Sequence, residues 1–85
     1  MDMFIHYTAL PEGLSLEDVV DGLNQVMDEG GFVNGGPAGR IDMELEEEKL
    51  NPKLAQSAVK YYIQQVGFPR DTLIELGGMS INAYE

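Results

Sequence analysis

Apolar residues recur every three or four positions in two stretches of this chain, and each stretch predicts an amphipathic helix. The first stretch contains Leu16, Val19, Val20, Leu23, Val26 and Met27. Ser15 followed by Asp18 predicts an N-cap of the capping-box type, and Gly30-Gly31 predicts where the helix ends. Asp28 and Glu29 would then lie in the last turn, where their charge opposes the helix dipole.

The second stretch is bounded by equally clear signals. It contains Leu54, Ala55, Ala58, Val59, Tyr62 and Val66. Asn51-Pro52 predicts the start of this helix, because Asn is a favoured N-cap and Pro is tolerated at the first helical position. Gly67 predicts its end.

Other segments alternate between apolar and polar residues, which is typical of half-buried strands. Strands are predicted at Met3 to Leu10, at Phe32-Val33, at Arg40 to Glu46 and at Thr72 to Tyr84. The second of these is a short edge strand, because glycine and proline follow it. In the last strand the alternation reverses across Gly77-Gly78, so a bulge or tight turn is predicted there.

The alternation also predicts which residues share each face of the sheet. The inward face would carry Ile5, Tyr7, Ala9, Ile41, Met43, Leu45, Ile74, Leu76, Met79, Ile81 and Ala83. The opposite face would be open and would carry Phe4, His6, Thr8, Asp42, Glu44 and Glu46.

The order of these elements is strand, helix, short strand, strand, helix, strand. It predicts a single α+β domain over residues 1–85 with the βαββαβ plan of the ferredoxin-like fold. In this split βαβ, two-layer sandwich, both helices cover one face of an antiparallel sheet. A weak internal alignment, with Ile5 on Ile41 and Gly31-Phe32 on Gly67-Phe68, supports two pseudo-symmetric halves.

Charge narrows the class of partner. The chain has 15 acidic and 5 basic residues, a net charge of −10, and no Lys or Arg precedes Arg40. Such a surface repels nucleic-acid phosphates and anionic lipid, and attracts basic protein surfaces. We therefore expect no direct nucleic-acid or membrane partner.

Composition sets the broad class of protein. The hydrophobic fraction of 44% is within the globular range. Cys is absent, so no disulfide framework is possible, and the chain starts without the basic region and apolar run of a signal peptide. A cytoplasmic location is expected, and the oligomeric state, monomer or homodimer, is left open.

His6 is the only imidazole and the first candidate for chemistry. As a general base it would need a polar partner, and Thr8 or Glu44 across the sheet could supply one. As a metal ligand it has no second His and no Cys to join it. An ordinary surface histidine is the favoured interpretation.

The densest charge cluster is Glu44-Leu45-Glu46-Glu47-Glu48. Clustered oxygens suit Ca²⁺, but the calcium loop with its regularly spaced Asp and Gly is missing. A solvated strand end is the plain alternative, and a docking face for a basic partner is the functional one. No metal or other cofactor is predicted.

The Gly-rich segment from Gly30 to Arg40 matches neither of the glycine motifs that cradle phosphate. Gly36-Pro37-Ala38-Gly39 has the letters of the RNA-binding KH clamp, but it precedes a strand and lacks basic surroundings. A flexible turn is predicted, and Arg40 is a candidate for binding an anion. No Ser–His–acid or Cys–His order occurs, so the chain is not expected to be an enzyme.

The segment Leu10-Pro11-Glu12-Gly13-Leu14-Ser15, where a strand runs into an acidic helix, resembles the YggL family of small acidic bacterial proteins. The Gly-rich segment after the first helix is similar in placement. So is the ending, Ile74 to Gly77 with Asn82-Ala83-Tyr84. The chain lacks that family's basic N-terminal extension and the Trp with which its members often end. The resemblance implies a binding role at the large ribosomal subunit and no catalytic residues.

The sequence thus favours a non-enzymatic, acidic interaction module that docks a basic protein surface, with a ribosomal surface as one candidate. The predicted contacts are Asp42, Glu44, Glu46, Glu47 and Glu48, with Asp18, Asp21 and Asp28 as a second patch. The alternative is an inhibitor, such as an immunity or phage protein, that blocks a nucleic-acid enzyme by imitating phosphate charge. A ferredoxin-like oligomer with a pocket for a small molecule is a third class.

Overall fold

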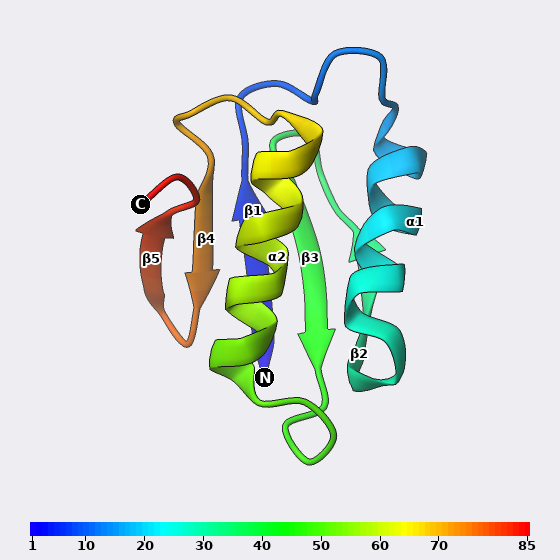
Figure 1. Cartoon of the computed structure of the whole chain (residues 1–85), viewed down its shortest axis with the longest axis vertical. Coiled ribbons are helices and arrows are strands. Elements are labelled where there is room, and N and C mark those ends of the chain that lie inside the picture. The colour runs from blue at the N-terminus through cyan, green and yellow to red at the C-terminus, as the bar shows by residue number, and fades with distance from the viewer.

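A computed structural model describes residues 1–85 as two helices packed on one face of a five-stranded antiparallel sheet (Figure 1). The elements are β1 (Asp2–His6), α1 (Leu16–Met27), η1 (Asp28–Gly30), β2 (Gly31–Gly35), β3 (Arg40–Leu45), α2 (Pro52–Val66), β4 (Leu73–Leu76) and β5 (Met79–Asn82). The strand order is β2-β3-β1-β4-β5. The predicted α+β ferredoxin-like sandwich is confirmed, and β5 extends it by one strand.

Both predicted helix starts are present. The Ser15 hydroxyl accepts the Asp18 N–H at 3.2 Å, while the Asp18 carboxylate accepts the Ser15 N–H at 3.0 Å, which completes the capping box. Asn51 accepts the Lys53 N–H at 2.9 Å. The helix α1 is shorter than predicted. Asp28 has a φ of 52°, which ends the α-helix, and the chain continues as the short 3₁₀-helix η1.

The core lies between the helices and the sheet. It consists of Met3, Ile5, Val19, Leu23, Met27, Val33, Ile41, Met43, Leu45, Ala55, Val59, Ile63, Phe68, Ile74 and Ala83. Alternate residues of β1 and β3 enter this core. The prediction of which side chains of these two strands face inward is therefore confirmed. Neither α1 nor α2 has the length and apolar content of a membrane-spanning helix.

Two predicted strands have different bounds in the structure. The first ends at His6 instead of Leu10, because its neighbour β3 starts at Arg40. Beyond that point only the Tyr7 N–H continues the pairing, with the Gly39 carbonyl, and Tyr7 and Ala9 are not buried. The predicted two-residue edge strand is longer, since β2 includes half of the Gly-rich segment.

The predicted turn at Gly77-Gly78 is confirmed, but it splits the last strand into the hairpin β4–β5. Both glycines have positive φ, 61° and 81°, which two-residue hairpin turns require. Met79 was predicted to face inward, and its side chain is instead 74% exposed. The reason is that β5 lies at the edge of the sheet, beyond the cover of α2 (Figure 1).

The two helices meet where Tyr62 of α2 lies over Gly22 of α1. A Cβ atom at Gly22 would overlap the hydroxyl end of the tyrosine ring, so any larger residue would force the ring to move. Tyr62 is half-buried, and burial together with the charge of Asp18 raises the pKa of its hydroxyl. Helix contact therefore takes precedence over helix propensity at Gly22.

Replacing Gly22 with Ala is expected to destabilise the fold by roughly 1–3 kcal/mol through overpacking, although Ala is the better helix former by about 1 kcal/mol. Urea unfolding measures the change. Combining Gly22→Ala with Tyr62→Leu should recover part of the loss, because the smaller side chain leaves room for the methyl group. A stabilising Gly22→Ala substitution would contradict the close helix contact.

Candidate functional site

The face of the sheet opposite the helices is open and carries carboxylates on its central strands. Asp2 on β1 lies opposite Glu44 on β3. Phe4, two residues along β1, lies opposite Asp42 on one side and Glu75 on the other. The sequence predicted this face for Phe4, Asp42 and Glu44 but did not predict that Glu75 or Asp2 would join it.

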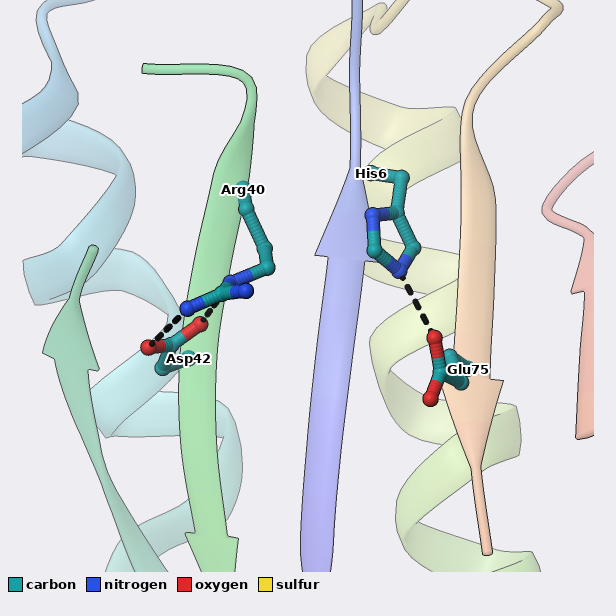
Figure 2. A network of polar contacts seen from close by, with 4 residues as sticks. All are labelled: His6, Arg40, Asp42 and Glu75. Carbon is teal, nitrogen blue, oxygen red and sulfur yellow. Dashed lines mark hydrogen bonds and ion pairs between the residues drawn. The ribbon is translucent and has the colours of Figure 1, made fainter. Parts of the chain in front are cut away.

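The middle of this face is internally neutralised (Figure 2). The Arg40 guanidinium donates to both oxygens of Asp42, at 2.7 and 3.2 Å, and lies 5.3 Å from the centre of the Phe4 ring. Hydrogen bonding to Asp42 and its charge raise the pKa of Arg40. Asp42 was a predicted contact residue, and Arg40 was considered for an anion from outside. The structure instead pairs the two with each other.

His6 is also paired on this face. Its Nε2 atom lies 2.9 Å from Glu75 Oε1, from the neighbouring strand β4 (Figure 2). The predicted partners, Thr8 and Glu44, were wrong, because Thr8 lies past the end of β1 and donates to Asp71. No cluster of three or more His, Asp or Glu side chains could hold a metal ion.

The end of the sheet where β1 starts is different, because its two carboxylates form no ion pair, and the nearby Met1 ammonium group donates instead to the Leu45 carbonyl at 3.1 Å. Asp2 and Glu44 are directly opposite each other, and neither forms an ion pair. Like charges directly opposite on adjacent strands destabilise a sheet. Phe32 on β2 lies on the other side of Glu44 with its side chain 45% exposed. The register therefore places two like charges where they are expected to cost stability.

The turn after β3 adds more carboxylates at the same end. Glu46 pairs with Lys49 at 3.2 Å, while Glu47 and Glu48 are exposed and form no ion pair. Residues 46–48 line a shallow depression together with Met1 and Leu45. Met1 directly precedes Asp2, so this depression joins the turn to the pair of Asp2 and Glu44.

The end of α1 reaches this place as well. The Glu46 N–H donates to the Gly30 carbonyl at 2.8 Å, and a second shallow depression is lined by Asp28, Glu29 and Lys49 among others. In Figure 1 the start of β1, the end of α1 and the turn after β3 all lie at the lower end of the molecule. We call this set the acidic pole: Asp2, Asp28, Glu29, Glu44, Glu46, Glu47 and Glu48.

The structure therefore regroups the two predicted patches. Asp28 joins the Glu run at the acidic pole, while Asp18 and Asp21 lie further up α1. Asp18 is occupied by the capping box, and its bonds to Ser15 lower the pKa of its carboxyl. Sequence reasoning missed Asp2, Glu29 and Phe32 as members of the site. Only the strand register and the fold of η1 against the turn after β3 bring them there.

No protein-family model, no curated protein and no solved structure matches this chain.

Replacing Glu44 with Gln is expected to stabilise the fold by roughly 0.2–1 kcal/mol, since it removes a like charge opposite Asp2. Urea unfolding at low and high salt measures the change, and the gain should shrink as salt screens the repulsion. Glu75→Gln is the matched control on the same face and should give no gain, because Glu75 has His6 as a partner. A gain that is absent or independent of salt would argue against charge repulsion.

The lowered pKa of Asp18 predicts how the free energy of unfolding depends on pH. Because its pKa is lowered in the folded state, its contribution is present above the pKa of the unfolded chain, about 4, and is lost as pH falls through the folded pKa. The stability difference between the wild type and Asp18→Ala should therefore vanish in acid. Asp21→Ala, which removes a carboxylate that makes no capping bond, should lack this profile. A difference that persists unchanged to the lowest pH would contradict the assignment.

Proposed function

We propose that this protein is a non-enzymatic binding module whose acidic pole docks a basic surface of another protein. The observation that carries the proposal is that Asp2 and Glu44 lie directly opposite each other in the pole and form no ion pair. A basic partner would supply the missing cations and relieve the repulsion. Proteins commonly retain a local conflict of this kind at a functional site.

Exposed apolar side chains support the same proposal. Phe32 and Met1 are each 45% exposed beside the carboxylates. Aromatic and methionine side chains are enriched in protein interfaces, where they add apolar contact to the polar pairs. Long-range attraction would bring the partner to the pole, and these two side chains would contribute once it is bound.

The proposed contact set differs from the sequence prediction. It keeps Glu44, Glu46, Glu47, Glu48 and Asp28, and it adds Asp2 and Glu29. Asp42 is given no contact role, because it lies outside the pole and Arg40 binds both of its oxygens, whereas Lys49 binds only one oxygen of Glu46. Asp18 and Asp21 are also left out, since they lie away from the pole.

A ribosomal protein surface is the candidate partner that the resemblance to the YggL family implies. Charge mimicry of nucleic acid is the alternative, and it requires evenly spaced free carboxylates. Along β3 and the following turn, Asp42 and Glu46 carry the cations Arg40 and Lys49, so the row is interrupted. A basic docking surface is therefore the better-supported proposal.

Two variants with the same net charge test the proposal. One neutralises the pole by Glu44→Gln, Glu47→Gln and Glu48→Gln, and the other neutralises distant exposed sites by Glu12→Gln, Glu17→Gln and Asp21→Asn. Capture from a lysate at low salt identifies the partner, and calorimetry then measures its affinity for each variant. The pole variant should bind at least about tenfold more weakly, and the wild-type affinity should fall with added salt.

Equal losses in the two variants would show that only the net charge matters, which would contradict a pole-directed site. An affinity that does not change with salt would contradict electrostatic docking. If the captured partner is a nucleic-acid enzyme and nucleic acid displaces this protein from it, the inhibitor alternative is supported instead.

A further inference from the structure

The two edges of the sheet are protected to different degrees. At the β2 edge, Asn24 of α1 accepts the outward N–H of Val33 at 2.9 Å, and a bulge between Val33 and Gly35 interrupts the strand. Both features prevent another strand from pairing there. At the opposite edge β5 has the sequence Met79-Ser80-Ile81-Asn82, with no charge, proline or bulge.

The backbone groups of β5 alternate between β4 and solvent. The Ala83 N–H donates to the Thr72 carbonyl, whereas the Asn82 carbonyl accepts the Glu85 N–H and so points away from β4. Since alternate residues of an antiparallel strand face the same neighbour, the N–H and C=O of Ser80 also point outward. Ser80 therefore presents one donor and one acceptor at an open edge.

The β5 edge is complementary to itself. If two copies pair in antiparallel fashion about Ser80, each Ser80 exchanges two backbone hydrogen bonds with its counterpart. The same register places Met79 of each copy opposite Ile81 of the other, on the side of the sheet that carries the helices. Met79 is 74% exposed and Ile81 is part-buried in the single chain, so the pairing would cover both.

We propose that β5 is a homodimerisation edge, on which a second copy of this chain adds its own β5 about Ser80. The net charge of −10 opposes contact between two copies over most of the surface, but β5 carries no charged side chain, so pairing about Ser80 brings no like charges of this strand together. The antiparallel arrangement also turns one copy upside down relative to the other. The two acidic poles then lie at opposite ends of a ten-stranded sheet, as far apart as the pairing allows.

The contact is small, so the dimer is weak. Four-residue strands cover much less than the roughly 1,600 Å² of a standard interface. Association is expected only as the concentration approaches about 1 mM, where a weak complex of about −4 kcal/mol is half formed. Because the two copies repel each other elsewhere, added salt should strengthen the dimer. Docking to a basic partner should respond to salt in the opposite direction.

Sedimentation equilibrium from about 10 μM to about 1 mM, at low and at high salt, tests the proposal. The apparent mass should rise from one chain towards two, and about 0.5 M salt should shift the dissociation constant several-fold towards dimer. Met79→Lys and Ser80→Pro should each weaken association at least about tenfold. The first removes the apolar pair and the second removes the outward N–H.

The matched controls are Leu54→Lys, which alters another exposed apolar side chain, and Ser80→Ala, which keeps the N–H. Both should associate as the wild type does, and circular dichroism confirms that every variant is folded. A monomer at all concentrations at high salt would overturn the proposal. So would association that Met79→Lys and Ser80→Pro leave unchanged, or that salt weakens. None of these outcomes bears on the acidic pole, which the charge-matched variants test separately.

Discussion

The register between β1 and β3 is the constraint on which the rest of the structure depends. It pairs Met3 with Met43 and Ile5 with Ile41, and all four side chains are buried. A slip of β3 by one residue would turn the carboxylates of Asp42 and Glu44 into the core, at a cost of several kcal/mol each. The apolar alternation therefore leaves one register, and this register also places Asp2 opposite Glu44. The core and the acidic pole result from the same pairing.

Much of the fold could be predicted from the sequence because its signals are local. The cap at Ser15, the Asn51-Pro52 start and the alternation in β3 each involve neighbouring residues, and each is present in the structure. The end of β1 and the exposure of Met79 were mispredicted for a different reason. The end of β1 depends on where its partner strand β3 starts, and the exposure of Met79 depends on how far α2 covers the sheet. Neither can be predicted from the pattern of neighbouring residues.

The candidate site was predictable only in part. The Glu run was visible as a charge cluster, but its grouping with Asp28 and Glu29 depends on the contact between Gly30 and Glu46. The neutralisation of Asp42 depends on the rotamer of Arg40, and the partner of His6 comes from a strand 69 residues away in the chain. Charge density alone could not separate the paired carboxylates from the free ones.

The acidic pole and the β5 edge divide the surface by charge. On the proposed function, the pole would repel its own copy and attract a basic surface, while β5 carries no charged side chain. With β5 paired, both poles remain open at opposite ends, so a dimer would present two docking sites. Two such sites on one partner surface would raise the effective concentration of the second binding event.

Backbone amide chemical shifts during titration with a lysine- and arginine-rich peptide test the central claim most directly. The largest changes should cluster at Asp2, Phe32, Glu44 and the turn of residues 46–48, and should disappear as salt is added. Changes concentrated on α1 around Asp18 and Asp21, or spread evenly over all carboxylates, would contradict a docking site at the acidic pole.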